Sequence, residues 1–325
     1  MHQAQRSYNS HSLAAVGAAL LASFASSAVS NAGTIRHDRT DLSYRNYAAQ
    51  PQFAGVGSYS TGGLFGSFTL IAPNWAMTAA HVVDTDADGL VSDEVISNDT
   101  LRIGGQSRTA TEVIVPTGIN GNRGWNGNIN SGFDIALVRF DTPFNLITPA
   151  SIYTSFQELG KNITQVGFGQ SGTGKSGSTG ASGTKRAGDN VVDRYVNFSN
   201  GATALRWDFD EPAPRTSTNW SGSSIPLDME YLIGSGDSGG GAFIFENNAW
   251  YVAGVHSGTY NSFNYPNAGD VDNASTYGDE ALVTRVSAYQ DFIFNSIPEL
   301  ATAIPEPSSL ALLGLAGLLV TRRRR

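Results

Sequence analysis

Hydrophobic residues recur along the middle of the chain in short runs that are separated by clusters of Gly, Asn, Asp and Pro. Short apolar runs between turn-forming residues are typical of strands in an antiparallel barrel or sandwich. A parallel sheet would need amphipathic helices between them, so the chain is predicted to be all-β. The pattern predicts a long exposed Gly/Ser/Thr-rich loop at 170–188 and one closing helix at 287–295. It predicts strands at residues 65–71, 113–115, 135–140, 163–168, 242–245, 250–255 and 281–286.

Both ends of the chain have the composition of sorting signals. Residues 13–24 are apolar, follow Arg6, and precede the small residues Ser30-Asn31-Ala32. This order is typical of a secretory signal peptide, and it predicts cleavage after Ala32.

The other end is an apolar segment at 310–320, followed at once by four arginines at 322–325. Arginines are expected beside a membrane by the positive-inside rule, although the apolar run is short for a span of about 20 residues. Together with Pro305-Glu306-Pro307, this tail resembles the PEP-CTERM sorting signal. The resemblance implies a Gram-negative secretion route, with transient membrane anchoring and cleavage by an exosortase near the Pro-Glu-Pro.

Composition narrows the class of protein further. A chain of 325 residues can form one large β domain or two ordinary ones. A formal net charge of −8 offers no basic surface to nucleic acid. Cysteine does not occur, which excludes disulfides, thiolate metal sites and a cysteine nucleophile. A secreted chain of this kind has to rely on its core, and a bound metal is one further source of stability.

Three short segments carry the residue types that acyl transfer needs. His81 ends Thr78-Ala79-Ala80-His81 just past an apolar run, and Asp134 stands directly before another. Ser238 lies among glycines in Gly236-Asp237-Ser238-Gly239-Gly240. The chemistry requires a base for the serine proton, an acid that orients the base, and N–H donors for the oxyanion. Each segment alone could be an ordinary turn or core residue, but the three together predict a Ser-His-Asp triad.

These segments resemble those of the trypsin-like serine proteases, and the similarity runs from about residue 53 to 293. The resemblance extends to Gly167-Phe168-Gly169 and to Gly254-Val255-His256-Ser257. It implies two six-stranded Greek-key β-barrels with a C-terminal helix, and a division into a signal peptide (1–32), a peptidase domain (33–300) and a sorting signal with a short transmembrane segment (301–325). It also implies roles: Ser238 is the nucleophile, His81 the general base and acid, and Asp134 the group that orients His81. The N–H groups of Gly236 and Ser238 form the oxyanion hole, and Ser257 supports Asp134.

The chain departs from this family at its amino terminus. Most members begin with Ile-Val-Gly-Gly, whose freed amine pairs with the aspartate before the serine, here Asp237. Nothing near Asp41 resembles that motif. Two partners for Asp237 therefore stay open: Gly33, if it is released by signal peptidase, or an internal Lys or Arg.

The expected substrate pocket involves Leu232, His256, Ser257 and Gly258. Leu232 stands six residues before the serine, where trypsin has an aspartate, so cleavage after Lys or Arg is not expected. His256 resembles a histidine of glutamyl endopeptidases and would favour Glu or Asp in the substrate. The alternative is a core histidine beside a pocket for small or medium apolar residues.

An acidic segment at 84–94 has the first half of a calcium loop, with acids at alternate positions followed by glycine. Asp84, Asp86, Asp88 and Glu94 are its candidate ligands, with the Leu90 carbonyl as a further oxygen. The alternative is a solvated acidic turn. Catalysis itself is expected to need no cofactor.

Two rival functions come from other classes of protein. Gly169-Gln170-Ser171-Gly172-Thr173-Gly174-Lys175-Ser176 fits the phosphate-binding loop of an NTPase, but the Gly/Ser-rich sequence after it does not favour the helix that such a loop requires. A binding protein on the protease fold with weak or no activity is the other rival. The prediction is a secreted or cell-surface serine endopeptidase, with protein or peptide substrates.

Overall fold

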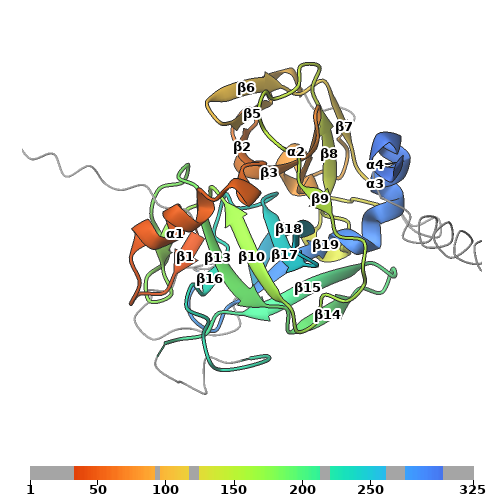
Figure 1. Ribbon diagram of the computed structural model, residues 1–325. Helices are drawn as coiled ribbons and strands as arrows, with labels where there is room; N and C mark the ends of the chain where they lie inside the picture. The colour runs from red at the N-terminus through yellow and green to blue at the C-terminus, as the bar shows by residue number, and fades with distance from the viewer. Residues whose placement is uncertain (1–32, 92–95, 117–123, 213–219, 261–274, 303–325) are drawn as a thin grey trace, which may run out of the picture.

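The computed structural model describes residues 33–91, 96–116, 124–212, 220–260 and 275–302. Strands dominate these residues and form two large curled sheets that lie against each other (Figure 1). The first and second sheets are called the first and second barrels below. Each sheet contributes to a hydrophobic core that its strands enclose. The prediction of an all-β, chymotrypsin-like fold is confirmed.

The first sheet has seven antiparallel strands in the order β6-β5-β2-β3-β4-β8-β7, one more than the six expected. Its core contains Phe68, Leu70, Met77 and Leu137, all fully buried. The strands are β2 (Val56–Ser60), β3 (Phe65–Ala72), β4 (Trp75–Thr78), β5 (Thr100–Ile103), β6 (Gln106–Thr109), β7 (Glu112–Ile114) and β8 (Ala136–Arg139).

The second sheet has the order β13-β10-β17-β18-β19-β15-β14, and β9 pairs in parallel with β18. Leu205, Trp207, Ile244 and Val283 are buried in its core. Its strands are β9 (Ser151–Ile152), β10 (Asn162–Gly167), β13 (Arg186–Val191), β14 (Arg194–Asn197), β15 (Thr203–Asp208), β17 (Gly241–Glu246), β18 (Ala249–Tyr260) and β19 (Glu280–Arg285).

A third, four-stranded sheet corrects the prediction of a long exposed loop at 170–188. Its order is β12-β11-β1-β16, formed by β1 (Gly33–Ile35), β11 (Ser171–Thr173), β12 (Gly177–Ser178) and β16 (Tyr231–Leu232). The loop prediction was wrong because β1, far away in the sequence, supplies a pairing partner for β11. Small residues let the hairpin close, since a Cβ atom on Gly172 would lie 1.6 Å from the carbonyl oxygen of Gly177. Lys175 lies in the turn of this hairpin and begins no helix, which argues against the NTPase alternative.

The described helices are short. They are α1 (Asp41–Ala48), α2 (Ala80–Val83), α3 (Gln290–Ser296) and α4 (Pro298–Thr302), with 3-10 turns η1 (Pro51–Phe53), η2 (Ile96–Asn98), η4 (Ile129–Ser131) and η5 (Val286–Tyr289). The predicted closing helix is confirmed as η5 followed by α3, which lies beside the first sheet (Figure 1). None of the helices within the described ranges is long and apolar enough to cross a membrane. The predicted signal peptide and the apolar tail both lie outside those ranges.

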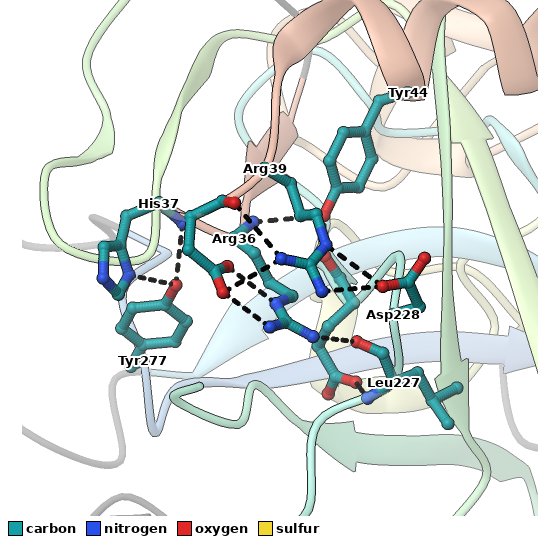
Figure 2. A network of polar contacts seen from close by, with 9 residues as sticks. Arg36, His37, Arg39, Tyr44, Leu227, Asp228 and Tyr277 are labelled. Carbon is teal, nitrogen blue, oxygen red and sulfur yellow. Dashed lines mark hydrogen bonds and ion pairs between the residues drawn. The ribbon is translucent and has the colours of Figure 1, made fainter. Parts of the chain in front are cut away.

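Polar contacts fasten the amino-terminal segment to the second barrel (Figure 2). The backbone N–H and Nδ1 of His37 lie 3.0 and 2.9 Å from the hydroxyl oxygen of Tyr277, and Arg36 donates to the carbonyl of Leu227 at 2.7 Å. Arg39 pairs with Asp228. These contacts hold β1 in place and fix the position of Gly33 beside the second barrel.

Candidate active site

His81 and Asp134 form the centre of the candidate site. The chain turns from β4 into the short helix α2, which places His81 opposite Asp134, two residues before β8. Nδ1 of His81 lies 2.8 Å from Oδ2 of Asp134, and the backbone N–H of His81 donates to Oδ1 at 2.9 Å. The Asp134 side chain is fully buried, whereas that of His81 is 29% exposed. The carboxylate therefore holds the Nδ1 edge of the imidazole, while Nε2 remains available to accept a proton.

The second barrel holds Asp134 from the opposite side. Ser257 of β18 donates from its hydroxyl to Oδ2 of Asp134, as the family resemblance implied. Thr284 of β19 donates to the carbonyl oxygen of Asp134 at 2.8 Å. Asp134 thus belongs to the first barrel in sequence and is oriented by hydroxyl groups of the second.

Asp134 also raises the proton affinity of His81. Burial by itself would lower the pKa of the imidazole, but the charge of Asp134 and its hydrogen bond to Nδ1 raise it, and the charge of Asp84 adds to this effect. The pKa of His81 is raised above its ordinary value of 6.5 as the net result. Such a histidine is a stronger base that can still lose its proton in the range where proteases work.

Ser67 of β3 holds the turn that carries Ser238. Its backbone N–H donates to the Ser238 carbonyl at 2.7 Å, and its hydroxyl donates to the Gly236 carbonyl at 3.0 Å. The same hydroxyl accepts from the backbone N–H of Phe168 at 3.0 Å. The nucleophile turn of the second barrel is therefore attached to a strand of the first.

Ser238 lies close to the helix that carries His81. A Cβ atom on Gly66 would lie 2.9 Å from Val82 and 3.1 Å from the Ser238 carbonyl oxygen, so the two segments meet at one point. Within the described residues no hydrogen bond joins the Ser238 hydroxyl to His81. In ligand-free sites such bonds are often long and tighten only with substrate.

The backbone of the nucleophile turn presents free donors. The N–H groups of Gly236 and Ser238 donate to no other residue in the described part of the chain. Gly239, the residue directly after Ser238, has a φ of +83°, and a Cβ atom there would lie 2.0 Å from the hydroxyl oxygen of Thr78. Only glycine fits that position, which gives the turn its tight shape. Such a turn can direct two N–H groups at one oxygen.

Asp237 is held by neutral donors. Its Oδ1 accepts from the N–H of Gly169 at 2.7 Å, and its Oδ2 accepts from the N–H of Gly234 at 2.8 Å and from the Tyr231 hydroxyl at 3.1 Å. No Lys or Arg of the described residues forms an ion pair with it; Arg186 attracts it only at longer range. Burial raises the pKa of Asp237 to about 6, against the lowering effect of these hydrogen bonds.

Gly33, the first residue after the expected signal cleavage, lies against this group. A Cβ atom on Gly33 would overlap the Tyr231 hydroxyl oxygen, at 1.9 Å, and this hydroxyl binds Asp237. The structure therefore brings the expected mature amino terminus near Asp237. An ion pair between the freed amine and Asp237 stays a prediction.

The residues expected to form the substrate pocket are mostly buried. Leu232 is fully buried in β16, and its carbonyl accepts from Thr34 of β1. His256 is also fully buried: Nδ1 lies 3.3 Å from the carbonyl oxygen of Asp237, and Nε2 has no partner among the described residues. Burial lowers the pKa of His256 to about 3, so its imidazole is neutral here. Gly258 is half-buried, next to the bulge between β18 and β19. Residues 261–274, which follow, lie outside the described residues.

The acidic segment after His81 forms a compact group. Asp84, Asp86 and Asp88 each have a carboxylate oxygen within 4.8 Å of the others, and Asp84 is buried while the other two are exposed. Glu94, the fourth expected ligand, lies outside the described residues.

Several residues that position the site were not identified from the sequence. Ser67 and Thr284 lie within strands whose pattern indicated only core and surface positions. Tyr231 has no motif around it, and its contact to Asp237 depends on the packing of β16 against β1 and β13. The signal that the sequence offered for Ser67 and Thr284 was a polar residue within an otherwise apolar strand.

Two β-barrels that meet at an Asp-His pair and a glycine-bounded serine define the class of a chymotrypsin-type serine protease. A comparison with family models agrees: residues 44–293 match the model of the trypsin family, and the chain belongs to that family. Residues 303–325 match the PEP-CTERM protein-sorting motif. The chain is also similar to a solved structure described as a Glu endopeptidase in complex with MPD, at 20% identity and a TM-score of 0.48 over 76% of this chain and 94% of that one.

Proposed function

We propose that the protein is a secreted serine endopeptidase that hydrolyses peptide bonds through an acyl-enzyme. The observation that carries this proposal is the Asp134-His81 pair, with its 2.8 Å contact, beside a serine turn that has two free N–H donors. A binding protein without activity would not need these donors and this buried carboxylate to be arranged around one serine.

The mechanism follows from the positions of these groups. The Ser238 hydroxyl attacks the carbonyl carbon of the scissile bond while Nε2 of His81 takes its proton. The imidazolium that forms is stabilised by Asp134, and the oxyanion accepts from the N–H groups of Gly236 and Ser238. His81 then gives the proton to the leaving amine, and the C–N bond breaks. Water, deprotonated by His81, hydrolyses the ester and restores Ser238. Each of these steps uses groups of the chain itself.

The substrate pocket is proposed to take uncharged side chains. Leu232 offers no carboxylate to a Lys or Arg, and the neutral, buried His256 offers no positive charge to a Glu. This supports the apolar alternative over the acidic one for the residue before the scissile bond.

The sorting motif at the carboxyl terminus supports an extracellular localisation for the protein. The PEP-CTERM motif indicates secretion and surface sorting in Gram-negative bacteria. We propose that signal peptidase removes residues 1–32, that the tail anchors the chain transiently, and that an exosortase then releases it to the cell surface or matrix.

The test uses the protein recovered from outside its host cell and treated with a fluorophosphonate. Intact-mass and peptide analysis should find one adduct, on Ser238, in a chain that lacks the terminal arginines. Matched peptides with Leu, Gln, Glu or Arg before the scissile bond should be cleaved fastest at Leu. Ser238→Ala should lower kcat/KM by about 10⁶-fold with an unchanged melting temperature, because the triad acts as a unit. Ser107→Ala, at an exposed serine of β6, is the control.

Substantial hydrolysis by the Ser238→Ala variant would refute the assignment of the nucleophile. A well-folded wild-type protein that neither takes the label nor cleaves any peptide would favour the alternative, a binding protein on the protease fold.

A further inference from the structure

The acidic group after His81 differs from an ordinary surface turn because one of its members is buried. Asp84 is 2% exposed, and it ends the helix that carries His81. Asp86 and Asp88 are exposed, yet their carboxylate oxygens lie within 4.8 Å of the one from Asp84. Like charges this close repel one another unless a cation lies between them.

The Asp84 carboxylate is oriented from one side only. Its Oδ2 accepts from the indole N–H of Trp125 at 2.6 Å and from the N–H of Gly89 at 2.9 Å. Its Oδ1 is buried and has no hydrogen-bond partner among the described residues. A buried carboxylate oxygen without a donor is costly, and the Asp84 carboxylate belongs to the group whose oxygens lie within 4.8 Å of one another. The unsatisfied oxygen therefore points to a ligand that the group would bind.

The loop that carries these acids packs directly on the segment that leads to Asp134. A Cβ atom on Gly89 would lie 2.7 Å from backbone atoms of Asn126, and one on Gly127 would lie 2.4 Å from the Ala87 carbonyl oxygen. Trp125, the donor to Asp84, is itself buried. An ion bound to this loop would therefore fasten the chain after His81 to the chain before Asp134.

We propose that Asp84, Asp86 and Asp88 bind a calcium ion that stabilises the two segments carrying His81 and Asp134. The carbonyl of Leu90 is a further oxygen ligand by its position in the loop, one residue after the glycine. Calcium fits this set because it takes hard oxygen ligands at about 2.3–2.6 Å in flexible geometry, so two ligands of one ion lie up to about 5 Å apart. The inference does not depend on protease activity.

The experiment uses the full chain with Ser238→Ala, which prevents self-digestion. Thermal unfolding is followed in EGTA and then in a calcium titration. Calcium should raise the melting temperature in a saturable way, by on the order of 5 °C at about 100 times its dissociation constant. Asp86→Asn/Asp88→Asn, at two exposed positions, should raise the calcium concentration needed for a half-maximal response at least tenfold. Asp141→Asn/Asp291→Asn removes the same charge from exposed acids elsewhere and should leave the response intact.

Terbium provides a second readout of the position of the ion. Because Trp125 touches Asp84, excitation of tryptophan should sensitise the emission of bound Tb³⁺, and Trp125→Phe should remove most of that emission. Three results would overturn the proposal: no saturable response to calcium up to about 10 mM, an equal response in Asp86→Asn/Asp88→Asn, or unchanged terbium emission in Trp125→Phe. An equal response to Mg²⁺ at the same concentrations would overturn the assignment to calcium.

Discussion

The hydroxyl of Tyr231 is expected to keep the nucleophile turn in its active shape, and Tyr231→Phe tests this. The tyrosine is fully buried and donates at 3.1 Å to Oδ2 of Asp237, the residue before Ser238. In the family, this aspartate is expected to pair with a freed amine, whereas here its described partners are neutral. Phenylalanine keeps the ring and removes only the donor, so the packing around it should change little.

The size of the effect follows from the type of hydrogen bond. A hydrogen bond to a charged group contributes about 1.5–3 kcal/mol, which corresponds to a shift of roughly 10- to 100-fold in the equilibrium between ordered and disordered turn. The pKa of Asp237 is already raised to about 6 by burial, and the Tyr231 hydroxyl is one of the groups that lower it. In the variant this pKa should rise further. A larger fraction of Asp237 is then protonated near neutral pH, and the protonated form accepts hydrogen bonds less well.

The assay is the pH dependence of kcat and KM on one peptide substrate. Because the turn supplies the oxyanion donors, Tyr231→Phe should lower kcat by up to roughly 10- to 100-fold near pH 6–7 and should change KM less. The kcat of the variant should recover in part as the pH rises. Tyr44→Phe is a matched control: this hydroxyl is also buried and lies in the same cluster, but it donates to the carbonyl of Glu230. A Tyr231→Phe enzyme with the wild-type kcat and pH profile would refute the reasoning.

Two further predictions concern the proton on His81 and a buried ion pair. Because Asp134 raises the pKa of His81, kcat/KM should fall with decreasing pH around a midpoint above 6.5; a midpoint clearly below 6.5 would contradict the contact between them. Arg285→Met leaves the fully buried Glu158 without its ion-pair partner, so urea unfolding in the Ser238→Ala background should show a loss of about 3–5 kcal/mol. Asp228→Asn breaks an exposed pair and should cost less than about 1 kcal/mol, and equal losses in both variants would contradict the argument.

The sequence predicted strands best where a continuous apolar run marks them. β3, β10 and β19 lie within about one residue of the predicted ranges, since their buried positions alone determine the pattern. The sheet built from β1, β11, β12 and β16 was missed, because its strands are two or three residues long and three of them, β1, β11 and β12, are rich in Gly, Ser and Thr. Their pairing depends on contacts between residues about 140 and 200 positions apart, which local pattern does not reveal.

The same distinction holds for the site. His81, Asp134 and Ser238 could be proposed because each lies in a motif whose local chemistry is recognisable. Ser67 and Tyr231 could not, because they act on atoms of residues 169 and 6 positions away, respectively, and carry no motif of their own. Hydroxyl groups in buried strands must find partners, but the sequence does not say which ones.

The two halves of the candidate site hold each other in place. Asp134, which precedes a strand of the first barrel, is oriented by hydroxyls of β18 and β19 in the second. Ser238, in the second barrel, is held by the backbone and hydroxyl of Ser67 in the first. Asp134 and Ser238 are therefore each held in part by the barrel to which they do not belong, whereas His81 is held by Asp134 of its own barrel. Because the contacts run in both directions, we expect docking of the two barrels to stabilise both the position of Asp134 and the serine turn.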